Sequence, residues 1–322
     1  MIPTGVELIV VTPVYEDLEA SSRLFRELDA AFGGRLFILA VDDGSVRQPL
    51  PGNAFAGLSA HGAVVKLRRN VGHQRAIAIG LGVAADYMTE KQCVVVMDSD
   101  GEDLPGTIPP LLAALNDPQV DVAVAQRKSR VETLRFKAFY EVYKRLFAFM
   151  TGRAITFGNF MAFSFSAVRR LAAMQELPIH VAAATLASKL RLRVCPLDRG
   201  PRYAGQSKMN FVGLALHGFR ALMVFAEDVL VRVGLLCVAI AAFSVLGGAL
   251  AIGLKLAGFA TPGWFSVAFG ILLLTLLQTG TLALMMLMLT GVVRSGSVTS
   301  AAGYKEFIDC VLVSGERVRL NG

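Results

Sequence analysis

Cysteine, histidine and tryptophan are all scarce in this chain of 322 residues, and their scarcity argues against several classes of site. The four cysteines lie far apart with no CxxC pair, so the sequence indicates neither a disulfide framework nor a zinc site. The four histidines have no metal-ligand spacing, and neither a Ser-His-Asp set nor a nucleophile elbow can be assembled. These absences disfavour a hydrolase, and a reducing compartment fits the cysteine pattern best.

Charge is also sparse in this sequence. Charged residues make up 18% of the chain and hydrophobic residues 54%, which gives a mean hydropathy of +0.55. The apolar excess is concentrated near the C-terminus, and this distribution predicts a membrane protein. The net charge of +7 suits a protein that works beside anionic lipid or binds phosphates. No finger, basic zipper or RNA-binding signature occurs, so we expect no nucleic acid partner.

The N-terminal part of the chain alternates short apolar runs with helical patterns, from residue 6 to about residue 194. The first run, VELIVVTP, has no basic leader before it, so it predicts a strand and not a signal peptide. Strand and helix in regular succession predict an α/β fold with a mostly parallel sheet and helices on both faces. Ligands in such sheets bind beyond the carboxyl ends of the strands, where this chain places two acidic clusters, VDDGS and MDSDGED.

Two long uncharged stretches, 233–254 and 264–293, each exceed the roughly 20 residues that cross a bilayer core. A soluble helical hairpin of that length should show a polar stripe, so two membrane spans are the favoured interpretation. Arg232 before the first stretch and Arg294 after the second predict that both chain ends and the catalytic domain face the cytoplasm. We therefore expect an integral protein of a bacterial-type inner (plasma) membrane, with helices that could also support a homo-oligomer.

These patterns divide the chain into four predicted segments. The segments are a catalytic domain over 1–208, an amphipathic interfacial helix over 209–231, a two-helix transmembrane anchor over 232–294 and a cytoplasmic tail over 295–322. The interfacial helix is predicted because its polar residues keep to one edge. The tail shows only weak strand character, at EFIDCVLV.

The second acidic cluster contains Asp98, Ser99 and Asp100, a DxD sequence directly after an apolar run. Its carboxylates can together hold a hard divalent cation such as Mg²⁺ or Mn²⁺ that also bridges two phosphates. Taken alone, the cluster could equally be a solvated acidic turn. It is not an EF-hand, because the loop lacks the required Gly at its sixth position and Glu at its twelfth. Similarly, GLGVAA from Gly80 fits one helix packed on the sheet better than a dinucleotide-binding turn.

Five motifs together carry a resemblance to a known family. In chain order they are VTPVYED, AVDDGS, LRRNVGHQRAIAIG, VVVMDSDGEDLPGTIPPLL and PRYAGQSKMN. With this order and spacing the chain resembles the family-2 glycosyltransferases, and within them the polyprenyl-phosphate type typified by dolichyl-phosphate mannose synthase and the bactoprenol glucosyl transferases. The resemblance implies a GT-A-type domain, a nucleotide diphospho-sugar donor (a UDP- or GDP-sugar) and a polyprenyl (undecaprenyl) phosphate acceptor.

The resemblance also assigns residues to the nucleotide. It implies that five residues line the nucleotide pocket, with Asp43 on its base or ribose side: Pro13, Tyr15, Asp17, Val41 and Asp43. The family's PVYNE is PVYED in this chain, so Glu16 and Asp17 are both candidates for the role of the acid.

For the diphosphate and its metal, the resemblance points to Asp98, Ser99 and Asp100. The predicted metal ligands are Asp98, Asp100 and Glu102, and the predicted cofactor is Mg²⁺ or Mn²⁺. The family's DADLQDPP has Gln at the position of Glu102, so this chain offers an anionic ligand where the family has an amide.

Several negative charges meet in a cleft of this kind, so cations must hold them together. The resemblance implies that Arg127 and Arg135 bind the acceptor phosphate, while Arg202 and Lys208 belong to a loop that closes over the donor. These four, with Asp98 and Asp100 of the DxD sequence, are the predicted catalytic residues. The neighbouring residues Lys128 and Arg130 fit a solvated basic turn equally well.

A phosphate acceptor needs no dedicated base, because a phosphate monoester with a second pKa of about 6 is largely dianionic at neutral pH. We therefore expect catalysis by positioning and charge neutralisation, in one displacement that inverts the anomeric carbon. A processive polysaccharide synthase is disfavoured, because the single tryptophan, Trp264, does not lie in a QxxRW motif. A non-catalytic nucleotide-binding scaffold and an enzyme with another acceptor both stay open. UDP-glucose, GDP-mannose and amino-sugar donors are likewise not separated by the sequence.

Overall fold

The computed structural model describes residues 1–127, 134–203, 211–259, 261, 263–295 and 301–318. The chain separates into two compact units. Unit 1 holds the sheet and comprises residues 1–140, 155–224 and 300–322. Unit 2 holds two long helices and comprises residues 141–154 and 225–299.

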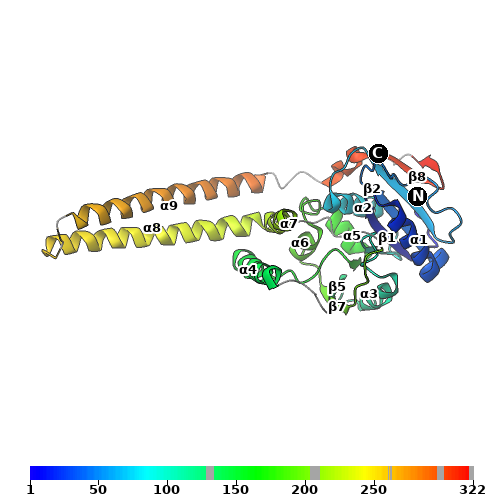
Figure 1. Cartoon of the computed structure of the whole chain (residues 1–322), viewed down its shortest axis with the longest axis horizontal. Helices are drawn as coiled ribbons and strands as arrows, with labels where there is room; N and C mark the ends of the chain where they lie inside the picture. The colour runs from blue at the N-terminus through cyan, green and yellow to red at the C-terminus, as the bar shows by residue number, and fades with distance from the viewer. Residues whose placement is uncertain (128–133, 204–210, 260, 262, 296–300, 319–322) are drawn as a thin grey trace. The chain divides into compact units, whose positions relative to one another are not determined.

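A nine-stranded sheet runs through the described part of unit 1 (Figure 1). Its strands are β1 (Leu8–Val14), β2 (Leu36–Asp42), β3 (His61–Leu67), β4 (Cys93–Val96), β5 (Val122–Arg127), β6 (Met161–Phe163), β7 (Leu192–Leu197), β8 (Ile308–Val313) and β9 (Glu316–Val318). The strand order is β7-β5-β6-β4-β1-β2-β3-β8-β9, and β6 and β8 run antiparallel to their neighbours. The predicted α/β fold with a mostly parallel sheet is therefore confirmed, and the antiparallel β6 is a strand that the sequence did not predict.

Helices cover both faces of this sheet, as the alternating pattern predicted. On one face lie α2 (His73–Tyr87), α5 (Phe165–Ala172) and α6 (Val181–Ala187), and on the other lie α1 (Leu18–Phe32) and α3 (Ile108–Leu115). Successive side chains of a strand point to opposite faces, so Ile9 and Val11 join the core beneath α2 whereas Leu8 and Val10 join the core beneath α1. Burial on both faces explains why this strand is apolar throughout.

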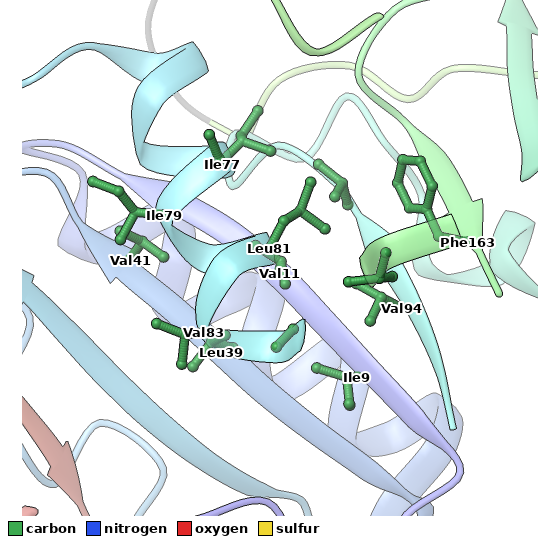
Figure 2. Packing of buried hydrophobic residues seen from close by; sticks show 14 of the residues in the cluster. Ile9, Val11, Leu39, Val41, Ile77, Ile79, Leu81, Val83, Val94 and Phe163 are labelled. Carbon is green, nitrogen blue, oxygen red and sulfur yellow. The ribbon is translucent and has the colours of Figure 1, made fainter. Parts of the chain in front are cut away.

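Figure 2 shows the core between the sheet and α2, in which Leu81 lies beside Val11 of β1 and Ile79 lies beside Val41 of β2. Gly80 permits the close approach, because a Cβ there would lie only 2.5 Å from a methyl carbon of Val11. The GLGVAA stretch is thus part of one helix packed on the sheet, as predicted. Val41 is completely buried in the same core, so its side chain packs beneath α2, and its predicted place in the nucleotide pocket stays a prediction.

Residues 301–318 belong to unit 1 and do not form a separate tail. The 3-10 helix η4 (Ala301–Phe307) leads into β8, which pairs with β3, and β9 then forms the edge of the sheet. The hydroxyl of Tyr304 donates to Asp86 at 2.5 Å, and its ring lies against Gly82, where a Cβ would be 2.9 Å away. The predicted strand character of EFIDCVLV is confirmed, but these strands are part of the main sheet.

Unit 2 contains two long apolar helices, α8 (Ala226–Leu256) and α9 (Trp264–Ser295), drawn in yellow and orange in Figure 1. Within the segments Ala226–Leu256 and Trp264–Thr290, stretches of 18 residues reach mean hydropathies of 2.5 and 2.0, and both segments are long enough to cross a membrane. Apolar side chains such as Phe243 and Leu287 are 73% and 74% exposed. A core helix of a soluble protein would bury such side chains, so the two helices are candidate membrane spans.

The segment predicted as one interfacial helix contains a helix boundary. The helix α7 (Phe211–Val224) ends before Phe225, and α8 begins at the next residue. Leu216, Phe219 and Met223 are exposed at spacings that place them on one face of α7. The amphipathic character predicted for this segment therefore falls on α7, while the acids that follow belong to the first turn of α8.

The end of α4 (Leu134–Thr151) packs against the start of α8 within unit 2. The rings of Phe147 and Phe225 meet edge to face with centroids 5.8 Å apart. Arg232 donates from its guanidinium to the backbone carbonyl of Phe149 at 2.6 Å, which ties the last turn of α4 to α8. These contacts hold the end of α4 against the start of α8.

Candidate active site

The carboxyl ends of β1, β2 and β4 meet at one edge of the sheet, because these strands are parallel. β1 lies between β2 and β4, so the chain connections pass to opposite sides of β1 at this point. β4 ends at Val96 opposite Val11, whereas β1 continues to Val14 and passes beyond the end of its neighbour. Open α/β sheets bind their ligands outside such a switch point, and the predicted acids follow these three strands.

One group of acids is held by backbone amides, and we call Glu16, Asp42 and Asp43 the backbone-held acids. The carboxylate of Glu16 accepts from the amides of residues 46–48 at 2.7–3.1 Å. Asp42 accepts from Ser45 and Leu50 at 2.9 Å. Asp43 accepts from the amides of residues 71 and 72 at 2.7 and 3.0 Å. These bonds hold the loops after β2 and β3 in place, and those to Glu16 lower its pKa.

The backbone-held acids change how the predicted nucleotide pocket is understood. Asp43 is only 3% exposed and both of its carboxylate oxygens accept amides, so its observed role is to support the loop before α2. Asp17 is half-buried at the N-cap of α1, without a side-chain capping bond in the described structure. Tyr15 is 47% exposed, whereas Pro13 is buried. With Glu16 bonded to the loop at residues 46–48, Asp17 is our predicted acid of the nucleotide pocket.

Residues 98–103 (DSDGED), which we call the acidic loop, follow β4 after a single residue, Met97. The buried carboxylate of Asp103 accepts from the backbone amide of Asp98 at 3.1 Å, and Asp100 accepts from the amide of Glu102 at 3.0 Å. Burial raises the pKa of Asp100, and the negative charges of Asp98 and Glu102 add to this effect. Burial likewise raises the pKa of Asp103, with Asp98 adding to it and Arg199 opposing it. Because burial and neighbouring negative charges disfavour the ionised form of these carboxylates, a bound cation would stabilise that form.

A second segment, residues 199–203 (RGPRY), lies along the acidic loop. Its backbone donates from Gly200 to the carbonyl of Glu102 and from Tyr203 to the carbonyl of Asp100, both at 2.9 Å. The guanidinium of Arg202 lies 3.0 Å from a carboxylate oxygen of Asp100 and 3.2 Å from one of Glu102. Arg199 pairs with the other oxygen of Glu102 and lies 3.5 Å from Asp103. The two arginines thus neutralise part of the acidic loop from within the protein.

Tyr203 covers the middle of the acidic loop. Gly101 has a φ of +87°, and a Cβ there would lie 2.6 Å from the Tyr203 ring, so glycine is required on both counts. The Tyr203 hydroxyl donates to Glu27 of α1 at 2.5 Å, and the guanidinium of Arg23 lies 4.2 Å from the ring centroid. Burial and this carboxylate raise the pKa of Tyr203, which keeps the hydroxyl protonated. The ring therefore joins the acidic loop to α1.

His73, the first residue of α2, brings a basic side chain to the acidic loop. Its Nε2 lies 3.2 Å from a carboxylate oxygen of Asp98 and 3.2 Å from the side-chain nitrogen of Asn159. Burial opposes the charged imidazolium, but Asp98, Asp100 and Asp43 together raise the pKa of His73 above its ordinary value. The raised pKa favours the protonated form of His73 beside the predicted diphosphate site.

Two other histidines form a neutral pair nearby in unit 1. The Nδ1 of His180 accepts the amide of Ala183 and caps α6, while its Nε2 lies 3.0 Å from Nε2 of His217 on α7. The proton of neutral His180 must therefore lie on Nε2, which donates to His217. Burial lowers the pKa of His180 to about 3, and the neighbouring His217 and Arg220 add to this effect. The pair joins the start of α6 to α7 without adding charge.

The predicted acceptor-binding and closing-loop cations are less completely described. Lys208 lies outside the described residues, as do Lys128 and Arg130. The backbone places Arg127 at the last position of β5 and Arg135 in the first turn of α4, and their side chains lie outside the description. The structure thus brings together Arg202 and the acids of the loop, and the roles of the other cations stay predictions.

The acidic loop offers only part of a site for the predicted divalent metal. Among the described residues, no three His, Cys, Asp or Glu side chains converge as a metal site. Asp98 and Asp100 still offer hard oxygen donors, and Mg²⁺ is commonly held by one or two carboxylates together with substrate phosphates. The pair therefore fits an ion that is shared with a diphosphate. Glu102 faces two guanidinium groups instead, so the geometry does not support its predicted place among the metal ligands.

Three residues of the site were not identified from the sequence: His73, Asp103 and Arg199. His73 directly follows Gly72 and opens the helix after β3, and this position near a strand's carboxyl end was the available signal. Asp103 was given no role in the site from the sequence, yet it is buried and its carboxylate accepts from the amide of Asp98. Arg199 lies 97 positions from Glu102, and no local pattern reveals a pair so distant in sequence.

Comparison with known proteins shows which family and which solved structures this chain is similar to. The model of the family described as "Glycosyl transferase family 2" matches residues 9–177, more than half of the chain. A dodecaprenyl-phosphate galacturonate synthase of Rhizobium johnstonii is 28% identical over 136 residues, which cover 40% of this chain and only 38% of that protein. The glucosyl-3-phosphoglycerate synthase of Mycobacterium tuberculosis, solved with Mn²⁺, UDP and glucosyl-3-phosphoglycerate, has a similar fold. Its TM-score is 0.50 at 14% identity, over 71% of this chain and 80% of that one.

Proposed function

Because this chain belongs to glycosyl transferase family 2, we propose that it transfers a sugar from a nucleotide diphospho-sugar to a polyprenyl phosphate. The observation that carries the proposal is the position of Asp98 and Asp100 at the carboxyl end of β4, with Arg202 only 3.0 Å from Asp100. Carboxylates and a guanidinium in one place, beside the switch point of a parallel sheet, suit a diphosphate bound together with a cation.

In this proposal the acidic loop and the RGPRY segment bind the leaving diphosphate. Asp98 and Asp100 would hold Mg²⁺ or Mn²⁺, which when bound supplies positive charge to the departing diphosphate. Arg202 leaves its partner Asp100 and pairs with the diphosphate in the same place. Asp17 and Tyr15 bind the nucleoside at the end of β1. The M. tuberculosis structure was solved with Mn²⁺ and UDP, which makes this pair the first choice for a binding assay.

The acceptor is proposed from the apolar helices and the named relative. A relative called dodecaprenyl-phosphate galacturonate synthase names a polyprenyl phosphate in its product, and α8 and α9 would hold this chain at a bilayer that contains such lipids. Arg127 and Arg135 are the proposed ligands of the lipid phosphate. The dianionic phosphate attacks the anomeric carbon without a base, and one displacement inverts that carbon. Arg232 and Arg294, which flank the two apolar stretches, support a reaction at the cytoplasmic face.

A donor panel tests the proposal. Full-length protein in lipid nanodiscs is incubated with undecaprenyl phosphate and radiolabelled UDP-glucose, UDP-galacturonate, UDP-N-acetylglucosamine or GDP-mannose, with Mn²⁺ or with EDTA. Label that moves into the organic phase with one donor, and that EDTA abolishes, supports the proposal. The anomeric configuration of the product, determined by NMR, tests inversion.

The same preparation separates an enzyme from a nucleotide-binding scaffold. A scaffold would bind UDP or GDP, seen as a thermal shift, without moving label to lipid from any donor. Transfer to a soluble acceptor with none to undecaprenyl phosphate would retain the glycosyltransferase and overturn the lipid acceptor. Asp117→Asn is the matched control for variants of the acidic loop, because Asp117 pairs with Arg193 on the surface and should leave transfer unchanged.

A further inference from the structure

The charges of the acidic loop and the RGPRY segment form one alternating series. It runs from Asp100 to Arg202, then to Glu102, Arg199 and Asp103. Glu102 is its central member, because one of its carboxylate oxygens faces Arg202 at 3.2 Å and the other faces Arg199. All five side chains are at most 30% exposed, so water screens their pairing less than it would at the surface. Removing Glu102 would leave both arginines without their shared partner.

The geometry points to Arg199 and Glu102 as positioning residues for the donor site. Arg199 holds Glu102, and Glu102 holds the guanidinium of Arg202 beside Asp100, so that the cation for the leaving diphosphate is in place before the donor binds. This inference rests on the proposed function, since it assigns a role in binding the nucleotide donor. Arg199 acts only through Glu102 and Asp103, and neither it nor Glu102 is required to touch the donor.

The competing role for Glu102 is that of a third metal ligand. To coordinate an ion, its carboxylate would have to leave two guanidinium groups, and Arg199 would keep only its 3.5 Å contact with Asp103. Truncating one partner of a charged, partly buried pair leaves the other charge uncompensated. The two carboxylates of Asp98 and Asp100 already match the charge of a divalent metal, so Glu102 is not needed as a third anionic ligand.

The experiment compares four variants of the full-length protein in nanodiscs: Arg199→Gln, Arg199→Lys, Glu102→Gln and the double variant with both glutamines. Mn²⁺ binding is followed by electron paramagnetic resonance without nucleotide, and UDP binding with saturating Mn²⁺ by calorimetry, with GDP in parallel. Melting temperatures establish that each variant is folded. The matched control is Arg193→Gln, which breaks a surface pair with Asp117 and should change neither affinity.

We expect Glu102→Gln to bind Mn²⁺ within about twofold of the wild type and UDP about tenfold more weakly, the scale of a lost charged hydrogen bond. Arg199→Gln should weaken UDP binding by a similar factor, and Arg199→Lys by less. The double variant should be no weaker than either single variant, because the two residues act as one unit. In the transfer assay, the donor KM should rise more than kcat falls.

Three results would overturn the inference. Loss of Mn²⁺ binding in Glu102→Gln without nucleotide would make Glu102 a metal ligand. Unchanged UDP affinity in Arg199→Gln, or fully additive losses in the double variant, would show that the pair does not position Arg202. If the wild type itself binds neither UDP nor GDP, the proposed function fails and this inference fails with it. A wild type that binds nucleotide beside variants that match it would overturn the inference alone.

Discussion

The two acid clusters at the carboxyl edge of the sheet are satisfied in different ways. Glu16, Asp42 and Asp43 accept hydrogen bonds from backbone amides of neighbouring loops. Asp100 and Glu102 also pair with side-chain guanidinium groups. An amide of the folded backbone cannot leave without unfolding its loop, whereas a guanidinium can exchange for another cation by rotating its side chain. The backbone-held acids therefore fix the loops of the site, and the acids of the acidic loop can exchange a guanidinium group for another cation.

The largest effect should come from the exchangeable cluster. Asp100→Asn keeps an oxygen that can accept the amide of Glu102 but removes the charge beside Arg202. Sugar transfer should fall by about 10²–10³-fold, the scale of removing one electrostatic group from a transition state. The melting temperature should change little, because burial already disfavours the charged form of Asp100. Transfer to lipid and thermal unfolding measure the two effects, and full transfer in Asp100→Asn would contradict this role.

The backbone-held cluster should show the opposite pattern. Asp43→Ala leaves the amides of Val71 and Gly72 without their acceptor, at a cost of about 2–4 kcal/mol in the free energy of unfolding. Chemical denaturation of the full-length protein measures this loss. Asp17→Ala is the contrasting variant: it removes no side-chain cap, so it should reduce UDP binding with little loss of stability. Equal stability losses in both variants would remove the distinction.

Gly101 tests whether the geometry of the acidic loop matters as well as its charge. Gly101→Ala places a methyl group in a left-handed conformation and against the Tyr203 ring, which should cost about 1–3 kcal/mol of stability and weaken UDP binding. Gly106→Ala is the control in the adjoining turn, because nothing lies within 4 Å of its Cβ position. Thermal unfolding and calorimetry of the two variants should differ clearly, and equal behaviour would show that Tyr203 does not restrain the loop.

The smallest effect concerns the neutral pair of His180 and His217, which belongs neither to the backbone-held acids nor to the acidic loop. The pKa of His180 is lowered to about 3, below the value of about 6.5 expected in the unfolded chain. Its contribution to stability is therefore complete above pH 6.5 and declines as the pH falls, by about 1 kcal/mol between pH 6.5 and 5.5. His180→Asn retains a capping side chain and should lack this part of the decline. Unfolding at several pH values tests it, and parallel curves would contradict it.

The prediction from sequence succeeded where the signals were local. The strands at Leu8–Val14 and Leu36–Asp42 were recognisable as apolar runs, and α2 as one helix across its glycines. The short β6 was missed because three residues carry too little periodicity to identify a strand. The burial of Val41 beneath α2 was not predicted, because its strand is buried on both faces and its position before two acids did not reveal which way the side chain points.

In the candidate site, too, features with a local signal were predicted and contacts between distant segments were not. The acids at 98–103 were identified because they follow an apolar strand directly, and Arg202 because it lies in a recognised motif. The loop-supporting bonds of Glu16 and Asp43 could not be predicted, since their partners lie about 30 residues away in sequence. Arg199 is more distant still from Glu102, and its role depends on how residues 199–203 return along the acidic loop.

The sequence alone determined the α/β class, the two long apolar helices and the presence of acids at strand ends, because each depends on periodicity or composition within one segment. Only the tertiary structure decided which acids face backbone amides and which face guanidinium groups. Electrostatic partners are chosen by distance in space, and the fold brings Arg199 and Arg202 to Glu102 across about 100 residues of chain. Without that approach, DSDGED would be an acidic turn like many others.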